Sequence, residues 1–378
     1  MDIGVIGAGE CFREKIGPAL NSLGDFSVKW VVEVLPEEEV RQSMRDSGLP
    51  DDFLYTVPDA DGFLHNLPDL DVDAVFDTSP SRYHASNISL SLNSGIHVYA
   101  EKPFSINRDN ILQVRDSLHA NPDLLAYFSE YYRDEKGLGF RVLLGEILPG
   151  DWYEQFIEPG IDPQIRNALD SLQPIKRIYG TCLEGVGKKS GISHRLWVGD
   201  RDQGGQLLDM STHLITFPVM LHDVIGDLSL TECIAGVCEE AKIEYAKKTG
   251  REISETYAET RFKSGSGCNI EFKFGKYTGV AERALIIEGE NGTIRIDFET
   301  QVMQVDTPSY KGNLRVISDP KYNVIVRDFA RRLGDSRHHL PYMFDVSSRT
   351  LGHIIEAREN VSRTFVHKAG DLKPIGYL

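Results

Sequence analysis

The chain has 378 residues, 41% of them hydrophobic and 26% charged, which is an ordinary composition for a folded protein with a sizeable core. Its 41 basic and 57 acidic residues give a formal net charge of −16, so broad binding to nucleic acid or to an anionic membrane is not expected. At roughly 100–200 residues per domain, this length predicts two or three domains.

Cysteine use and hydropathy narrow the class of protein further. The five cysteines are scattered and form no Cys-x-x-Cys pair, which argues against a disulfide framework and against a thiolate zinc site. No run of about 18 apolar residues occurs, so no membrane-spanning helix is expected. The first residues lead directly into a strand-like run, without a basic region or a cleavable apolar segment. We therefore expect a cytoplasmic enzyme or small-molecule binder.

The first 125 residues alternate short apolar runs with helical stretches, which is typical of βαβ units around a parallel sheet. The pattern predicts strands at 3–6, 28–33, 73–77 and 96–100, with a helix from Gly9 to about residue 23. Such spacing predicts a doubly wound α/β domain.

Beyond about residue 175 the pattern changes to strands with few helices between them, and the pair Asn291-Gly292 is typical of a tight hairpin. We expect an α+β domain with a large, mostly antiparallel sheet. Residues 146–173 contain several prolines and predict an irregular or helical insertion, interpreted as a lid or an oligomer contact. The predicted strands are 175–183, 229–238, 255–263, 268–274, 283–288 and 293–298, and helices are predicted over 324–333 and 346–358.

Gly7-Ala8-Gly9 follows the first predicted strand and precedes a helix, which is the context that a dinucleotide-binding fingerprint requires. Glycine allows the sharp turn and lets a pyrophosphate approach backbone N–H groups at the helix N-terminus. Phe12 stands where the fingerprint has its third glycine, so the local geometry is expected to differ. Two glycines are also compatible with a plain tight turn.

Glu33 ends the second predicted strand, where an acidic side chain can accept hydrogen bonds from a ribose 2′-hydroxyl. Val34, Leu35 and Pro36 follow it and offer no cation for a 2′-phosphate. If a nucleotide binds here, the sequence favours NAD over NADP. The alternative interpretation is a solvated carboxylate at a strand end.

Glu101-Lys102-Pro103 follows the strand predicted at 96–100. Pro103 biases Lys102 toward extended geometry, so the lysine is expected to project from the carboxyl edge of the sheet, where ligands bind in open α/β folds. There it can hydrogen-bond a substrate hydroxyl and stabilise a developing alkoxide. A surface lysine that only promotes solubility is the alternative.

Asp209 and His213 are four residues apart, which predicts that they lie one above the other on a helix face. Histidine is well suited to proton transfer near neutral pH, and Asp209 can orient it or bind substrate. Gly204 and Gly205 precede the pair and suit close approach of a ligand. A structural histidine on a capped helix and a metal pair are the alternatives, and no third metal ligand stands at a recognisable spacing.

Together these segments are similar to the Gfo/Idh/MocA family, the glucose–fructose oxidoreductase, inositol dehydrogenase and rhizopine-catabolism group, over nearly the whole chain. The segments that carry the resemblance are 4–9 and 18–20, Ser79-Pro80-Ser81-Arg82-Tyr83-His84, 95–103, 204–213 and 287–293.

The resemblance implies a Rossmann domain over 1–125 and a substrate-binding and oligomerisation domain over 126–378, whose sheet would form a homodimer or homotetramer. It implies hydride transfer between a nicotinamide cofactor and a hydroxyl or keto carbon of a sugar, cyclitol or related polyol. NAD is the expected cofactor, and NADP is less favoured. Lys102 would polarise the substrate oxygen, His213 would be the acid–base residue, and Asp209 would bind a hydroxyl. The implied substrate-binding set is Lys102, Tyr132, Trp197, Asp209 and His213. The cofactor-binding set is Gly7, Gly9, Glu10, Cys11, Phe12, Glu33, Ser79, Pro80, His84, Glu101 and Lys102.

Departures from the family pattern leave other functions open. Gln206 replaces the third glycine before Asp209, and Ser211 replaces the glycine between Asp209 and His213. One alternative is an enzyme that holds NAD tightly and uses it transiently for epimerisation, elimination or glycoside cleavage. The other is a non-catalytic Rossmann sensor, which a bulky Phe12 crowding the pyrophosphate would favour.

Overall fold

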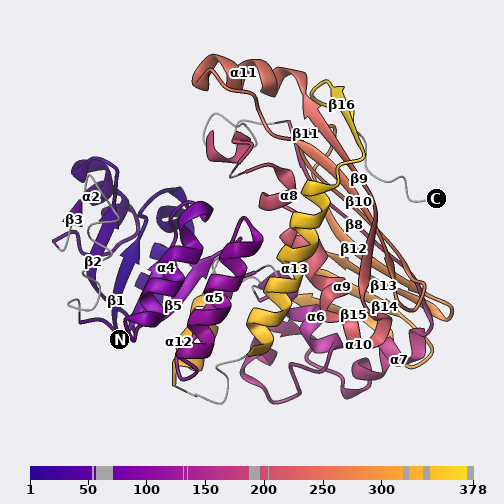
Figure 1. Ribbon diagram of the computed structural model, residues 1–378. Helices are drawn as coiled ribbons and strands as arrows, with labels where there is room; N and C mark the ends of the chain where they lie inside the picture. The colour runs from indigo at the N-terminus through magenta and orange to yellow at the C-terminus, as the bar shows by residue number, and fades with distance from the viewer. Residues whose placement is uncertain are drawn as a thin grey trace. The chain divides into compact units, whose positions relative to one another are not determined.

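The computed structural model describes residues 1–52, 55–56, 71–130, 132–133, 135–186, 196–202, 204–317, 323–334 and 341–372. The chain divides into two compact units (Figure 1). The N-terminal unit comprises Met1–Glu130 and Asp319–Ser348, and the C-terminal unit comprises Tyr131–Ser318 and Arg349–Leu378. A late segment of the chain thus joins the N-terminal unit, a feature that the sequence pattern did not predict.

The N-terminal unit is built on a six-stranded sheet in the order β3-β2-β1-β4-β5-β6, and every neighbouring pair is parallel. From β1 the chain adds strands first on one side (β2, β3) and then on the other (β4, β5, β6). The boundary between β1 and β4 is therefore the switch point of a doubly wound fold. The predicted parallel sheet is confirmed. Its strands are β1 (Asp2–Ile6), β2 (Ser27–Glu33), β3 (Tyr55–Thr56), β4 (Ala74–Asp77), β5 (His97–Glu101) and β6 (Ala126–Ser129).

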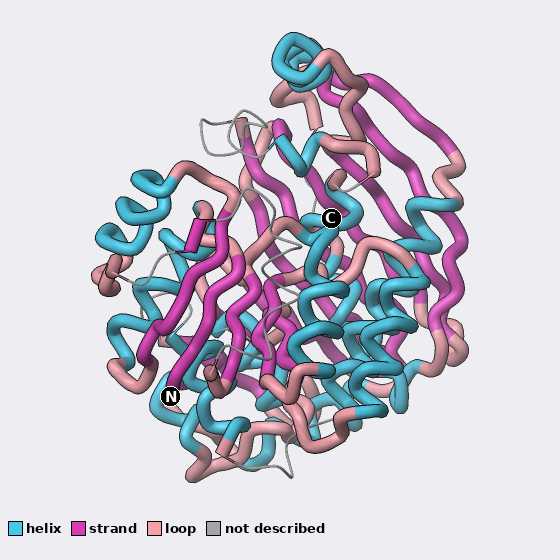
Figure 2. Tube along the Cα trace, turned by 60° about the vertical axis from the view of Figure 1, so that its left-hand side comes forward, coloured by secondary structure: helices cyan, strands magenta, loops and turns pink. Residues whose placement is uncertain are grey.

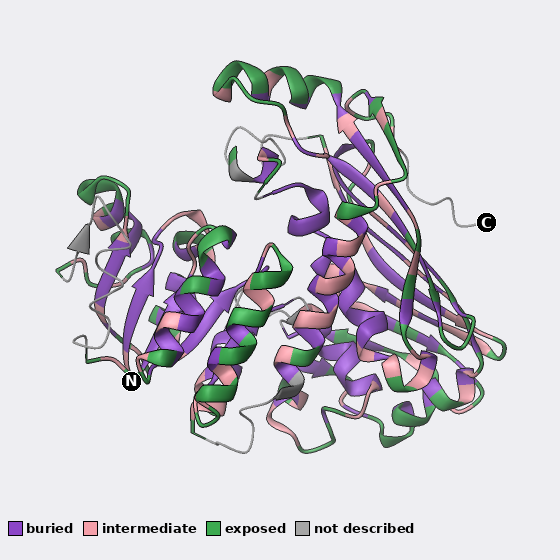
Figure 3. Cartoon of the chain, in the orientation of Figure 1, coloured by how far each residue is buried: buried purple, intermediate pink, exposed green. Residues whose placement is uncertain are grey.

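Helices cover this sheet, and Figure 3 shows their inward faces buried and their outward faces exposed. The strands β1, β4, β5 and β6 are almost entirely buried because apolar residues fill both faces, as expected of a parallel sheet between helix layers. The helices of the unit are η1 (Phe12–Ile16), α1 (Gly17–Leu23), α2 (Glu37–Asp46), α4 (Ser81–Asn93), α5 (Arg108–Ala120) and α12 (Asn323–Leu333).

An aromatic cluster explains why α12 belongs to the N-terminal unit. Phe76, Tyr99 and Tyr127, from three adjacent strands, stack with ring centroids 4.9 and 5.7 Å apart. Phe329 of α12 meets Phe76 edge to face at 5.2 Å. The Tyr127 hydroxyl also donates to Asp328 at 2.9 Å. This helix therefore closes one face of the sheet and is part of its core.

The C-terminal unit contains a ten-stranded sheet in the order β16-β9-β10-β11-β8-β12-β13-β14-β15-β7. The β16·β9 and β11·β8 pairs are parallel and the other pairs are antiparallel, so the sheet is mixed and mostly antiparallel, as predicted. The hairpin predicted at Asn291-Gly292 joins β12 to β13. The strands are β7 (Ile157–Glu158), β8 (Ile175–Gly185), β9 (Leu228–Cys238), β10 (Tyr257–Ser264), β11 (Asn269–Thr278), β12 (Glu282–Gly289), β13 (Gly292–Asp297), β14 (Val302–Asp306), β15 (Lys311–Val316) and β16 (Arg363–His367).

Helices of this unit pack against one face of the large sheet, whose strands lie side by side in Figure 2. Phe217 of α9 stacks on Phe298 at 5.5 Å, and the hydroxyls of Thr216 and Thr350 lie 3.2 Å apart, so α9 joins the sheet to α13. The helices are η3 (Glu135–Gly137), α6 (Leu138–Leu143), α7 (Ala168–Leu172), η7 (Leu196–Gly199), α8 (Gln206–Asp209), α9 (Thr212–Met220), α10 (His222–Ile225), α11 (Glu239–Thr249) and, from Arg349 onward, α13 (Pro341–Glu359).

The segment 146–173 forms short helical pieces around the brief strand β7, in line with the predicted irregular or helical insertion. Its elements are η4 (Trp152–Phe156), β7, η5 (Pro163–Asn167) and α7. Because β7 pairs with β15, the segment ends one edge of the large sheet. In the described parts of the chain, no helix combines the length and apolarity needed to cross a membrane.

Candidate active site

The carboxyl ends of β1, β2, β4 and β5 bring four predicted site residues to one edge of the N-terminal sheet. Gly7 follows β1, Glu33 ends β2, Ser79 follows β4, and Lys102 follows β5. All these strands are parallel, so their carboxyl ends lie at the same edge. This is the edge at which open α/β sheets bind ligands.

Gly7 is required by the backbone at the switch point. Its φ is +85°, and a Cβ there would lie 2.7 Å from the Ser79 nitrogen, closer than real Cβ contacts come. Gly9 differs, because a Cβ there would meet no protein atom within 4 Å. The first glycine therefore lets two loops touch, whereas the second leaves open space beside the backbone. That space fits the approach of a pyrophosphate.

Phe12 points into the core and not over the glycine loop. Its ring is fully buried with Ile3, Val5 and Ile16 in the main apolar cluster of the unit. Residues Phe12–Ile16 form a π-helical turn, which widens the helix locally. This turn is the altered geometry expected from the missing third glycine. Only the backbone of Phe12 is left to face a ligand.

The Glu33 side chain folds back onto the glycine loop. Its Oε2 accepts from the Ala8 N–H at 2.7 Å, and its Oε1 accepts from the Val34 N–H at 2.7 Å. The carboxylate therefore fixes the loop between the two glycines as well as standing at the strand end. Glu10 and Cys11, which begin the following helix, are half-buried beside this loop.

The loop after β4 is organised by Asp77, which is completely buried. Its carboxylate accepts from the Ser79 N–H at 3.0 Å and from the Ser79 hydroxyl at 2.6 Å. The side-chain amide of Asn87 donates to its other oxygen at 3.0 Å. These bonds hold Ser79 against Gly7, while Pro80 is exposed at the N-cap of α4.

His84 connects that loop to the turn that carries Lys102. Its Nδ1 lies 2.8 Å from the Pro103 carbonyl oxygen and its Nε2 lies 2.7 Å from the Ser79 carbonyl oxygen. The ring is buried. Glu101 is also buried, and its Oε1 accepts from the hydroxyls of Tyr99 and Ser129 at 3.3 and 3.1 Å. Lys102, between these anchored neighbours, is half-buried.

Asp209 and His213 do not share one continuous helix, which corrects the predicted helix face. Asp209 ends α8 and His213 is in the first turn of α9, with Met210 and Ser211 forming a break between them. The buried Ser211 hydroxyl donates to the Leu207 carbonyl oxygen, a bond that competes with regular helix geometry. Asp209 is buried and His213 is half-buried.

Glu255 of the segment before β10 anchors the start of α8. Its Oε1 accepts from the Leu207 N–H at 3.0 Å, and its other oxygen accepts from the Ser254 hydroxyl. Gly205 has a φ of +91°, and a Cβ there would lie 2.2 Å from that carboxylate. The glycine therefore makes room for the carboxylate that caps the helix carrying Asp209.

Lys276 is a charged neighbour of Asp209 that the sequence pattern did not reveal. It is buried on β11, and its Nζ lies 3.4 Å from Oδ2 of Asp209. It follows Phe272 and Phe274 at the strand period of two, so a lysine occupies an inward position of an alternating apolar pattern. The predicted strand 268–274 stops two residues before Lys276, and extending its alternation to residue 276 is the signal that could have found this lysine.

The other predicted substrate residues are only partly described. Tyr132 is buried, with the Arg133 guanidinium 4.8 Å from its ring centroid. Trp197 lies in η7, and its side chain is outside the described residues, as is Tyr131. Within the described residues, no group of three or more His, Cys, Asp and Glu side chains is arranged to hold a metal ion.

Solved structures of other proteins resemble this chain over both of its units. KijD10, a 3-ketoreductase from Actinomadura kijaniata in complex with NADP and TDP-benzene, is 17% identical with a TM-score of 0.67, over 97% of this chain and 99% of that one. UDP-N-acetylglucosamine 3-dehydrogenase GnnA from Acidithiobacillus ferrooxidans is 14% identical with a TM-score of 0.65, over 96% and 97%. At these identities the likeness is one of fold.

A family match complements this structural likeness. Residues 1–126 match the family GFO_IDH_MocA, described as an oxidoreductase family with an NAD-binding Rossmann fold. The match covers the region that contains the glycine loop, Glu33, His84 and Lys102. Residues 1–126 therefore match the model of the Gfo/Idh/MocA oxidoreductase family, which is the family predicted from the motifs of the chain.

Proposed function

We propose that the protein is an NAD-dependent oxidoreductase acting on a hydroxyl or keto carbon of a sugar, cyclitol or related polyol. The observation that carries this proposal is the gathering of Gly7, Glu33, Ser79 and Lys102 at one carboxyl edge of a parallel sheet. KijD10, a 3-ketoreductase in complex with NADP and TDP-benzene, and GnnA, a UDP-N-acetylglucosamine 3-dehydrogenase, share the fold and support this reaction class.

The N-terminal unit fits a dinucleotide in three respects. The backbone beside Gly9 is open, the helix after it begins at Glu10, and Glu33 stands at the end of β2. Backbone N–H groups around Gly7–Gly9 would hold the pyrophosphate, so an acidic chain needs no basic patch there. When bound, the nicotinamide ring supplies the hydride acceptor or donor, and the protein supplies binding and orientation.

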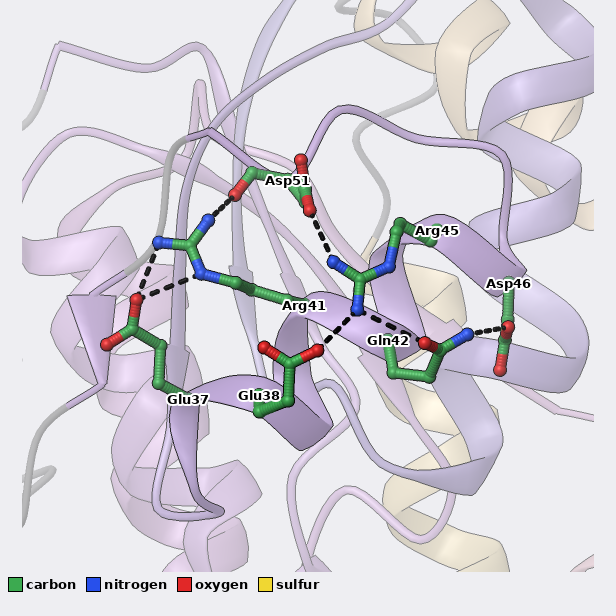
Figure 4. Close-up of polar contacts among 7 residues, drawn as sticks. All are labelled: Glu37, Glu38, Arg41, Gln42, Arg45, Asp46 and Asp51. Atoms are coloured by element: carbon green, nitrogen blue, oxygen red, sulfur yellow. Dashed lines mark hydrogen bonds and ion pairs between the residues drawn. The ribbon is translucent and has the colours of Figure 1, made fainter.

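Charges around the start of α2 support NAD over NADP in this chain. Figure 4 shows that carboxylates hold both arginines of this helix. Arg41 donates to Glu37 at 2.9 Å, and Arg45 donates to Glu38 at 2.7 Å and to Asp51 at 2.8 Å. The acidic first turn of α2 and Glu33 would repel a 2′-phosphate. KijD10 carries NADP, so cofactor preference needs its own measurement.

Lys102 is assigned the role of polarising the reacting oxygen. Its ammonium would hydrogen-bond the substrate hydroxyl or carbonyl and stabilise the negative charge that develops on that oxygen. His84 would serve this role indirectly, because it bonds the carbonyl of Pro103 next to the lysine and fixes the turn. A lysine held in one position loses less entropy when it engages the substrate.

His213 is assigned the proton transfer and Asp209 the binding of a substrate hydroxyl. In the oxidative direction His213 would accept the hydroxyl proton, and in the reductive direction it would return that proton to the oxygen. An imidazole suits this task because its proton exchange lies near neutral pH. Asp209, a buried carboxylate at the end of α8, offers acceptors for a neighbouring hydroxyl.

Turnover measurements test the proposal. Purified protein is assayed by the absorbance of reduced cofactor with a panel of sugars, cyclitols and UDP- and TDP-sugars, in both directions. We expect activity with at least one compound and a loss of at least about 100-fold in Lys102→Ala and His213→Ala. The exposed residues Lys311 and His119 provide matched control variants, Lys311→Ala and His119→Ala.

Two results contradict the proposal. Failure of both NAD and NADP to bind in a calorimetric titration would exclude the dehydrogenase function altogether. Full activity in both Lys102→Ala and His213→Ala would leave the reaction class standing but overturn the two assigned roles.

A further inference from the structure

Lys276 lies between two carboxylates in the C-terminal unit. Its Nζ is 3.4 Å from Oδ2 of Asp209 and 3.3 Å from Oε2 of Glu184. The side chains of Lys276 and Asp209 are each only 8% exposed, and Glu184 is 27% exposed. The ammonium is therefore the positive centre of a mostly buried group that three separate elements, α8, β8 and β11, bring together.

The row of charges continues from Glu184 toward the surface. Arg283 of β12 donates to Oε1 of Glu184 at 2.7 Å, and its Nε lies 3.3 Å from the 55%-exposed side chain of Glu299. Charges alternate in sign along the whole row, from Asp209 inside to Glu299 outside. Glu184 thus forms ion pairs with both Lys276 and Arg283. Together with Asp209, it is one of two carboxylates beside the Lys276 ammonium.

Buried ion pairs are weak evidence for a purely stabilising role. An apolar side chain of similar size usually stabilises such a position as well as a buried pair does. Position 276 follows Phe272 and Phe274 on the inward face of β11, where an apolar residue would continue the pattern. A lysine at this position is best explained by what it does to its partner, Asp209.

We propose that Lys276 is a positioning residue that keeps Asp209 ionised and fixes its orientation, so that Asp209 acts as a permanent hydrogen-bond acceptor for a substrate hydroxyl. An ammonium within 4 Å favours the charged form of a carboxyl group. An ionised Asp209 cannot donate a proton, which leaves acid–base chemistry to His213. The assignment of a substrate hydroxyl rests on the proposed function, whereas the control of Asp209 does not.

The first test needs no substrate. Asp209 protonation is followed by ¹³C NMR of aspartate carboxyl groups, with the Asp209 signal identified by its loss in Asp209→Asn. We expect Lys276→Met to raise the pH at which Asp209 takes up its proton by about one unit or more. Lys276→Arg should restore the original behaviour in large part. Equal titration of Asp209 in the original protein and in Lys276→Met overturns the proposal.

Lys273 of the same strand provides the matched control. It lies on the opposite face of β11 from Lys276, 3.8 Å from Glu259, and is likewise mostly buried at 18% exposure. Lys273→Met removes a lysine from β11 without touching Asp209, so it should leave the Asp209 titration unchanged. A similar change in both variants would show a general disturbance of the strand and would contradict the proposal.

Folding is checked by a thermal double-mutant cycle. Lys276→Met alone leaves two carboxylates without their common cation, so its unfolding temperature should fall by several degrees. Adding Asp209→Asn should recover part of that loss, because the uncompensated charge is removed. Strictly additive effects would mean that the two side chains are not coupled in solution, and the proposal would fail.

The substrate part is tested with the best compound from the activity panel. Lys276→Met should raise KM more than it lowers kcat, and the acid side of the pH profile of kcat/KM should move to higher pH. An unchanged profile overturns the link to substrate. If no compound is turned over while the Asp209 titration still shifts, the proposed function fails and the control of Asp209 by Lys276 stands.

Discussion

The two units hold their candidate site residues by different physical means. At the edge of the N-terminal sheet, Gly7 allows two loops to touch, and the ends of parallel strands present Glu33 and Lys102. In the C-terminal unit, Asp209 is held by charged side chains, with Lys276 beside it and Glu255 at the start of its helix.

This difference determines how each region responds to mutation. A site built on strand ends depends on the positions where only glycine fits and on the side chains that bond its loops, such as Asp77 and His84. A site built on buried charges depends on every member of its set, because losing one leaves the others uncompensated. The following predictions can sharpen the contrast or break it.

The largest effect is expected at the two glycines of the N-terminal loop. Gly7→Ala forces a left-handed backbone onto a side chain and brings its Cβ against Ser79, which should cost about 1–3 kcal/mol of folding free energy from the backbone alone and abolish NAD binding. Gly9→Ala should leave the unfolding temperature unchanged and weaken NAD about tenfold or more. Denaturant unfolding and calorimetry measure the two quantities. Equal stability loss in both variants would contradict the distinction.

The next effect is expected at the cap of α8. Glu255→Gln removes the charge that accepts the Leu207 N–H, and we expect a loss of about 1–2 kcal/mol in unfolding free energy. The exposed neighbour Glu252 gives a control, Glu252→Gln, that should be neutral. If Glu255→Gln is also neutral, charge does not hold this region and the contrast between the units disappears.

A selectivity change is expected at Glu33. Removing its charge in Glu33→Gln weakens repulsion of a 2′-phosphate, so the preference for NAD over NADP should fall about tenfold. Direct titration with both nucleotides gives the ratio. Asp46→Asn, at the far end of α2, removes a charge at a distance and should leave the ratio unaltered. A preference for NADP in the unaltered protein would refute the cofactor assignment itself.

The smallest effect is a pH dependence of stability from His353. Burial lowers the pKa of this histidine below its usual 6.5, with Arg349 adding to the effect and Glu356 and Asp227 opposing it. Between the lowered pKa and pH 6.5, the unfolded chain therefore binds a proton at this histidine that the folded chain does not. Its contribution to stability is full above pH 6.5 and is lost as the pH falls from 6.5 toward the lowered pKa.

Replacing His353 tests this sign. His353→Gln should flatten the fall in unfolding free energy between pH 7 and pH 5, as measured by denaturant unfolding at several pH values. The exposed His119 supplies the control, since His119→Gln should keep the original slope. A steeper fall in His353→Gln would mean that the charged form is favoured in the folded state.

Much of the fold could be predicted because local patterns coincide with tertiary structure. The apolar, β-branched runs that predicted strands correspond to β1, β2, β4 and β5 in the structure. The ends of these predicted strands were enough to locate Glu33 and Lys102 without knowledge of distant contacts. The place of α12 was not predictable in this way. Its pattern predicted a helix, but its attachment depends on Phe329 meeting aromatic rings more than 200 residues earlier in the chain.

The C-terminal part of the site was less predictable for the same physical reason. Spacing identified Asp209 and His213, but the break between them depends on the buried Ser211 hydroxyl bonding to the backbone. Lys276 was missed because its partners come from other elements and because the predicted strand 268–274 ended two residues before it, whereas β11 continues to Thr278. An ion pair between residues far apart in the chain produces no short sequence pattern that would predict it.

The attachment of α12 to the N-terminal sheet has a consequence for synthesis of the chain. The first unit to leave the ribosome lacks part of its core until residues beyond 330 have been made, by which time most of the second unit has emerged. The core of the N-terminal unit is therefore completed only when nearly the whole polypeptide is present. A chain ending near residue 318 would expose the apolar face that Phe329 covers and would be prone to aggregate.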